Sequence, residues 1–104
     1  MRFVVKKLSP TDADVVKAAA WYDDQRLGLG DDFLVEFENA ILLLAENALI
    51  YSVRFSDVRC IRLRRFTDYG VYYLVKNDNE VWVIAVHHGR RHPRWLRRRR
   101  NQIG

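Results

Sequence analysis

The sequence contains a single cysteine, Cys60, and no apolar run long enough to cross a bilayer. One cysteine excludes an intrachain disulfide and a zinc site built from several cysteines, and it fits a reducing compartment. The longest tightly apolar run, residues 40–45, is far shorter than the roughly 20 residues that a membrane span requires. Lys6 and Lys7 interrupt the first residues, so no signal-peptide core forms. These absences predict a cytoplasmic protein with no membrane partner.

Motifs of the common nucleotide-binding and hydrolase families are also missing. The sequence has no GxGxxG, no phosphate-binding loop and no GxSxG nucleophile motif. We therefore expect no small-molecule cofactor.

The three histidines, His87, His88 and His92, fall within six residues. Adjacent strand residues point to opposite faces, so the first two cannot readily share an ion. No cysteine or carboxylate lies close by in sequence to complete a metal site. We expect no metal, and the histidines are either structural or include one general acid or base.

What the sequence does contain is enough apolar material for one domain and a marked charge asymmetry. The chain has 104 residues, 49% of them hydrophobic, which predicts a single domain over residues 1–104. Residues 1–53 carry a net charge of −4 and residues 54–104 one of +9, which together give the net +5 of the chain. Twelve of the 13 cations in the second half are arginine. An arginine-rich segment of this kind can bind a polyanion or an acidic partner. Alternatively, its arginines form only a solvated surface.

The first half predicts a strand followed by a helical hairpin. Residues 2–8 are rich in valine and form the expected strand, and Ser9 and Pro10 are expected to start a helix, with Asp12 closing a capping box. Its apolar stripe consists of Val15, Ala19 and Tyr22, with Val16 and Ala20 beside them.

The hairpin turns at the Gly28-Leu29-Gly30 segment, where Gly28 suits a left-handed conformation. Asp31 and Asp32 are expected to start the second helix, whose stripe is Phe33, Phe37, Ala40, Ile41 and Leu44. Trp21 neighbours Tyr22 and cannot face the same way.

The second half changes to the period of two that is typical of strands. Residues 58–63, 70–76 and 80–88 predict a three-stranded antiparallel meander with a turn at 77–79. The fold class is therefore α+β: the helical hairpin covers one face of the sheet, the N-terminal strand joins the sheet, and the other face is turned to solvent or a partner. The basic tail forms a short helix from Pro93, or it frays because its four consecutive arginines repel one another.

An arginine set could converge on one rim of such a sheet, with aromatic residues interleaved to stack on unpaired bases. This arrangement would bind an RNA backbone or an acidic partner. Alternatively, the aromatics belong to the core and the arginines are solvated. The set comprises Arg59, Arg62, Arg64, Arg65, Arg90 and Arg91, and the aromatics are Phe66, Tyr69, Tyr72, Tyr73, Trp82 and Trp95.

These elements occur in an order that resembles the RelE/ParE superfamily of toxins. The hairpin resemblance rests on Trp21-Tyr22, Gln25, Gly28-Leu29-Gly30 and Phe33. The next strands are similar in Arg62-x-x-Arg65-Phe66, Tyr69 and Val71-Tyr72-Tyr73, and the closing strand and tail in the segment from Val83 through His88-Gly89-Arg90-Arg91 to Pro93 and Trp95. The resemblance covers roughly residues 3–97.

The resemblance implies the toxin half of a type II toxin–antitoxin (plasmid stabilisation) system, neutralised by a cognate antitoxin that lays an acidic or amphipathic segment over it. The family has two branches. ParE-like toxins poison DNA gyrase and are not enzymes, whereas RelE-like toxins are ribosome-dependent mRNA interferases. A third alternative is a basic nucleic-acid-binding module without toxicity.

We expect the ParE-like mode, because no tyrosine follows Tyr73, whereas the RelE branch commonly places a tyrosine or histidine near the C-terminus. If the interferase interpretation holds, Arg62, Arg90 and His92 are the predicted catalytic residues. The predicted target-binding or antitoxin-binding residues are Arg59, Arg64, Arg65, Arg91 and Trp95.

Overall fold

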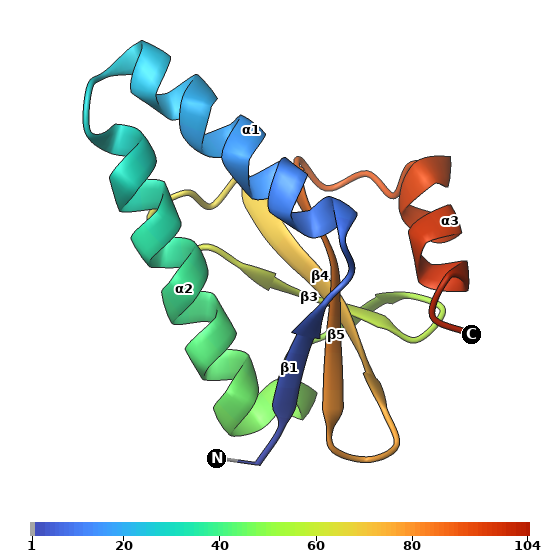
Figure 1. The fold of residues 1–104 in the computed structure, drawn as a ribbon. Coiled ribbons are helices and arrows are strands. Elements are labelled where there is room, and N and C mark those ends of the chain that lie inside the picture. Colours follow the sequence, from blue (N-terminus) through green and yellow to red (C-terminus); the bar gives the residue numbers. More distant parts are fainter. Residues whose placement is uncertain (1) are drawn as a thin grey trace.

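Two long helices lie on one face of a five-stranded sheet and a short third helix lies on the other face (Figure 1). The structure, a computed structural model, describes residues 2–104. The sheet order is β1-β5-β4-β3-β2, with β1 parallel to β5 and every other pair antiparallel. The elements are β1 (Val4–Lys7), α1 (Pro10–Gln25), α2 (Leu29–Asn47), η1 (Ala48–Ile50), β2 (Val53–Phe55), β3 (Val58–Arg62), β4 (Tyr69–Lys76), β5 (Glu80–His88) and α3 (Arg94–Asn101).

This arrangement confirms the predicted α+β class, the helical hairpin, the meander and the N-terminal strand in the sheet. The sheet nevertheless has one strand more than predicted, because β2 pairs with β3 as an edge strand. Strand β2 has only three residues, of which Val53 and Arg54 are exposed. So short a segment cannot show an alternating pattern, and sequence periodicity missed it.

The start of α1 differs from the predicted capping box. Ser9 has helical backbone angles, φ −52° and ψ −41°, and its side chain makes no cap hydrogen bond. A capping residue needs an extended backbone to turn its oxygen onto the first amides. The Thr11 hydroxyl instead donates to the Val83 carbonyl on β5, at 3.2 Å. Val16 and Ala20 were also wrongly placed in the buried stripe, since both are exposed.

The turn between α1 and α2 is tighter than predicted. Helix α1 ends at Gln25 and α2 begins at Leu29, before Asp31 and Asp32. Gly28 is left-handed as predicted, with φ +90°. Gly30 lies inside α2, where its amide donates to Asp23 Oδ1 at 2.8 Å and a Cβ would lie 2.4 Å from the Ala19 carbonyl oxygen. Glycine is therefore needed here for the close approach of the two helices.

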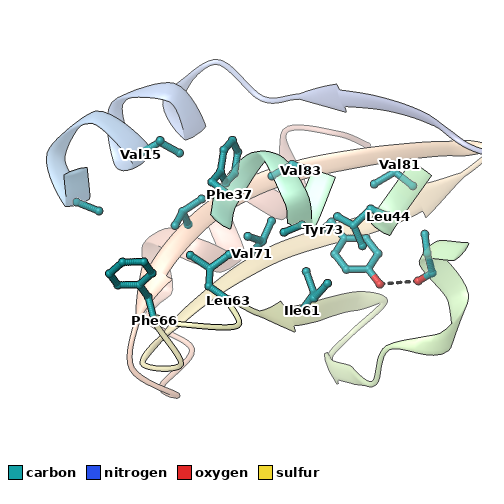
Figure 2. Close-up of a cluster of buried hydrophobic side chains, with 14 of the residues drawn as sticks. Val15, Phe37, Leu44, Ile61, Leu63, Phe66, Val71, Tyr73, Val81 and Val83 are labelled. Atoms are coloured by element: carbon teal, nitrogen blue, oxygen red, sulfur yellow. Dashed lines mark hydrogen bonds between the residues drawn. The ribbon is translucent and has the colours of Figure 1, made fainter. Parts of the chain in front are cut away.

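The main core fills the space between the helical hairpin and the sheet (Figure 2). Phe33, Phe37 and Leu44 from α2 meet Val71 and Tyr73 of β4. The Tyr73 hydroxyl donates to the Ala48 carbonyl, and burial raises the pKa of this phenol far above its ordinary value. Its hydrogen bond ties the sheet to the end of α2.

The second face of the sheet was expected to be open, but α3 covers part of it. Alternate residues of β4 point to this side, so Tyr72 and Leu74 belong to a second core that also contains Ile84 and the fully buried Leu96 of α3. The expected solvent-facing or partner-facing surface is therefore partly internal. The prediction missed this because the arginine-rich tail has few apolar residues.

Polar contacts also hold α3 in place, so the tail is a helix rather than a frayed end. The Arg99 guanidinium donates to both Asp14 oxygens, at 2.5 and 3.1 Å. Arg100 donates to both Asp57 oxygens, at 2.5 and 2.8 Å, and these bonds hold the pKa of Asp57 below its usual value. Two of the four consecutive arginines are therefore paired with carboxylates, which reduces the repulsion among them.

Within residues 2–104, no helix is both long and apolar enough to cross a membrane.

Candidate functional site

Arg62 lies at the corner of the sheet where β3 and β5 end and β4 begins. Its Nη1 donates to the carbonyls of Gly89 (2.9 Å) and Asp68 (3.3 Å), and its Nη2 lies 3.5 Å from the Tyr72 hydroxyl. Its Nε is buried and finds no hydrogen-bond partner among residues 2–104. These bonds tie together the loops that precede β4 and follow β5, so the guanidinium is largely engaged in holding this corner of the sheet.

The other predicted arginines of the sheet are dispersed. Arg59 donates to the carbonyls of Leu49 (3.1 Å) and Tyr51 (2.6 Å), which fastens the segment before β2. Arg65 is exposed, lies 5.7 Å from the Phe66 ring and pairs with Asp32 at 3.4 Å. Arg64 is exposed and lines a groove against α2. The set therefore does not converge on a single rim.

Arg90 and Arg91 are exposed in the loop that follows β5. This loop begins at Gly89, which has φ +90°, a conformation that other residues rarely adopt. Both arginines border a hollow of about 350 Å³ that is also lined by Trp95. Arg62 donates a hydrogen bond to the carbonyl of Gly89, the residue that directly precedes Arg90. The fold therefore brings Arg62 and Arg90 close together although they are far apart in the sequence.

His92 belongs to the same loop, but its side chain packs on the second face of the sheet. Its ring is half-buried, 5.0 Å from the Phe55 ring and 6.0 Å from the Tyr72 ring. Burial lowers the pKa of His92, and the positive charges of Arg97, Arg54 and Arg62 lower it further. This imidazole is therefore neutral at pH 7, able to accept one proton and donate one hydrogen bond.

The predicted catalytic trio thus shares one corner, to which the structure adds Tyr72. Sequence reasoning listed Tyr72 only among the aromatics that either stack on unpaired bases or belong to the core, because a tyrosine between Val71 and Tyr73 carries no mark of a catalytic site. Trp95 is half-buried in α3, with its ring 5.2 Å from His87 and 4.5 Å from the Arg99 guanidinium. It thus contributes to holding α3 against the sheet.

The second half of the chain remains strongly basic at its surface despite these internal contacts. Among residues 54–104, the exposed arginines are Arg54, Arg64, Arg65, Arg90, Arg91, Arg94, Arg97 and Arg98. An acidic segment or a polyanion would find several unneutralised guanidinium groups there.

An apolar groove of about 520 Å³ between α2 and β3 was not predicted. Leu42 and Leu43 of α2, which are 62% and 53% exposed, line it together with Ile61 and Leu63. The run of apolar residues from 40 to 45 is a signal that could have revealed it, because one buried stripe cannot use every member of such a run. Exposed apolar surface of this kind is typical of sites that bind a partner.

No group of three or more histidine, cysteine or acidic side chains that could hold a metal ion occurs in the described part of the chain.

Comparisons with known proteins show which class of protein this small α+β domain belongs to, a toxin of the RelE/ParE superfamily. The family model of the ParE toxin of the type II toxin–antitoxin system, parDE, matches residues 8–93, so the chain belongs to this family. A solved structure described as the chromosomal ParDE TA system from P. aeruginosa has a similar fold, with a TM-score of 0.63, 13% identity, and coverage of 85% of this chain and 97% of that chain. No curated protein matches the sequence significantly.

Proposed function

We propose that this toxin acts in the cytoplasm by poisoning DNA gyrase, without enzymatic activity of its own, and that a cognate antitoxin neutralises it by direct binding. The observation that supports a non-catalytic mode is the engagement of Arg62. Its guanidinium already donates to two backbone carbonyls, so it has fewer donors left for a scissile phosphate. Membership of the ParE family supports gyrase as the target.

A gyrase assay tests this proposal directly. The purified chain is added to DNA gyrase, relaxed plasmid and ATP, and the DNA products are separated after protein digestion. We expect loss of supercoiling and accumulation of cleaved plasmid. A reaction without gyrase controls for contaminating nucleases, and circular dichroism establishes that the chain is folded. Unchanged supercoiling at toxin in large excess over gyrase would contradict the proposal.

A second candidate function, ribosome-dependent mRNA cleavage, is favoured by the corner that contains His92. A neutral imidazole lies against Tyr72, whose hydroxyl is 3.5 Å from Arg62, and such groups could exchange protons and stabilise a phosphate. Primer extension on a message in a reconstituted translation reaction distinguishes the candidates. Cuts that need the ribosome and disappear in the Arg90→Ala and His92→Ala variants would establish the interferase. An intact message together with cleaved plasmid would establish the gyrase poison.

For the antitoxin, we propose the groove between α2 and β3 as a docking site. An amphipathic antitoxin segment would cover Leu42 and Leu43 with its apolar side. Acidic residues beside that side would lie near Arg64 at the β3 wall of the groove. Leu42 and Leu43 are 62% and 53% exposed, so their complete burial would contribute roughly 1–2 kcal/mol each, a little over half of the value for a fully exposed leucine. A basic module without toxicity remains the outcome if the chain neither binds an antitoxin nor arrests growth.

A further inference from the structure

A second concave surface, lined by residues of α1, β4, β5 and α3 around the end of β5, differs in chemistry from the groove on α2. It consists of three hollows of about 260, 280 and 350 Å³ that share lining residues. His88 lines all three. We call it the aromatic cleft and define it by Trp21, Tyr69, His87, His88 and Trp95.

The walls of the aromatic cleft are ring systems from four separate segments. The Tyr69 and His88 rings lie 5.0 Å apart at one end, and the His87 and Trp95 rings lie 5.2 Å apart at the other. Trp21, from α1, stands edge-on to Tyr22 at 5.1 Å and remains 55% exposed. A tryptophan usually buries most of its surface, so one left this exposed in a hollow lined by other rings offers a stacking surface.

The charge around the aromatic cleft is positive. Lys17 lines it on α1, and Arg90 and Arg91 line it in the loop after β5. Among the residues that line the three hollows in the described part of the chain, Asp14 is the one carboxylate, and it lines only the hollow of about 280 Å³. Its two oxygens are both engaged by Arg99, and one also accepts the Val86 amide. An anionic ligand would therefore meet cations and no unpaired carboxylate.

We propose that the aromatic cleft binds single-stranded nucleic acid, with an unpaired base stacked on the exposed Trp21 ring and the adjoining phosphates held by Arg90 and Arg91. Flat rings beside guanidinium groups suit a base and its phosphate, and every base offers a face for stacking. In a duplex these faces are covered by neighbouring base pairs, so the cleft selects single strands. This binding is separate from gyrase poisoning and does not depend on it.

Fluorescence anisotropy with the full-length chain tests the proposal. The probe is a fluorescein-labelled oligothymidylate of about 12 nucleotides, and a duplex of equal length serves as the comparison. We expect the single strand to bind at least several-fold more tightly than the duplex. Equal affinity for the two would overturn the proposal, because it would indicate only attraction between a basic surface and phosphate. The absence of binding by the folded chain would also overturn it.

Variants then locate the binding site. Trp21→Ala should weaken oligonucleotide binding about tenfold, whereas Trp21→Phe, which keeps a ring, should restore most of it. Val35→Ala removes an apolar side chain of similar exposure (57%) from α2, outside both the cleft and the groove, and should have no effect. Trp21 is exposed, so its loss should leave the circular dichroism spectrum unchanged. If Trp21→Ala binds the oligonucleotide normally but no longer binds the antitoxin, the cleft is a protein site and the proposal is wrong.

The salt dependence of binding provides a second, independent test. Arg91→Gln should lower the slope of log affinity against log salt by about 0.7, the value for one lost phosphate contact to a single strand. Arg98→Gln removes the same charge from an exposed position on α3 outside the cleft and should leave the slope unchanged. Equal effects of the two substitutions would contradict a localised site. Because this comparison uses only exposed arginines, it holds even if a tryptophan variant folds poorly.

Discussion

At the scale of single residues, Arg99 makes the most consequential contact of the tail. It joins α3 to Asp14 on α1 and also donates to the Ile84 carbonyl at 3.1 Å. Both charged side chains are more than four-fifths buried. Loss of the guanidinium would leave Asp14 in that position with only the Val86 amide as a donor. The cost of such a loss exceeds that of losing an exposed ion pair.

We predict that Arg99→Ala lowers the free energy of unfolding by about 2 kcal/mol, a value within the range for the loss of a hydrogen bond to a charged group. Urea unfolding followed by tryptophan fluorescence measures this. Arg98→Ala is the matched control, since Arg98 is exposed on the same helix, and it should change stability by less than about 0.5 kcal/mol. If both substitutions lowered the free energy of unfolding equally, the Arg99–Asp14 pair would contribute no stability beyond the difference in helix propensity between arginine and alanine.

The two half-buried histidines predict a pH dependence of stability. Burial lowers the pKa of His87 and of His92 in the folded chain, whereas in the unfolded chain both stay near 6.5. The unfolded state therefore takes up protons first as the pH falls. Stability should decline as the pH drops from 7 through 6.5 and level off only below the folded pKa values.

Thermal unfolding measured between pH 7.5 and 5 checks this decline. The double variant His87→Phe/His92→Phe keeps rings against Trp95 and Phe55 but cannot take up protons, so its stability should change less over the same interval. If the thermal stability of the double variant fell with pH as steeply as that of the original chain, groups other than these two histidines would cause the decline.

Some of these residue roles could be predicted from the sequence and others could not. Trp21 was expected not to share the direction of its neighbour Tyr22, and it is 55% exposed, although the edge of its ring still contacts the Tyr22 ring. Arg59 and Arg62 were expected at a binding rim, yet their guanidinium groups bind backbone carbonyls of loops. A sequence shows that an arginine is present but not which carbonyls the fold leaves unpaired nearby.

At the scale of elements, periodicity predicted what was long and regular. Helix α2 and strands β4 and β5 were located within a few residues because their patterns extend over eight residues or more. Strand β2 is too short for a pattern, and the role of α3 depends on Leu96, one buried residue in a helix of arginines. Removing residues 94–104 would expose the second core, so such a deletion cannot separate a role of the tail in toxicity from loss of the fold.

The groove beside α2 leads to a prediction for antitoxin binding. Leu42→Lys should weaken the antitoxin complex by at least tenfold, because a charge would replace a side chain that the antitoxin buries. Leu27→Lys, at the loop between α1 and α2, is the control, since Leu27 is 92% exposed and lies outside the groove. Isothermal titration with the purified antitoxin measures both. Similar losses from the two would place the antitoxin elsewhere on the toxin, and unchanged thermal unfolding would show that the fold is intact.

At the scale of the whole molecule, folding offsets only part of the charge asymmetry of the sequence. Asp14 and Asp32 from the acidic half pair with Arg99 and Arg65 from the basic half. These pairs join α1 to α3 and α2 to the loop after β3, so they also connect elements that are far apart in the chain. The exposed arginines that remain are available to partners of two kinds, an acidic protein and a nucleic acid.

These two kinds of partner should respond differently to salt, which is the prediction that belongs to the molecule as a whole. Binding to an oligonucleotide releases condensed counterions, so its affinity should fall steeply between about 0.05 and 0.2 M salt. In the proposed docking site the antitoxin would also bury Leu42 and Leu43, an apolar contribution that moderate salt does not screen. Its affinity should therefore fall by a smaller factor over the same interval. Parallel measurements by anisotropy and calorimetry give the two slopes, and equal slopes would mean that the antitoxin is held by charge alone and that the apolar groove is not its docking site.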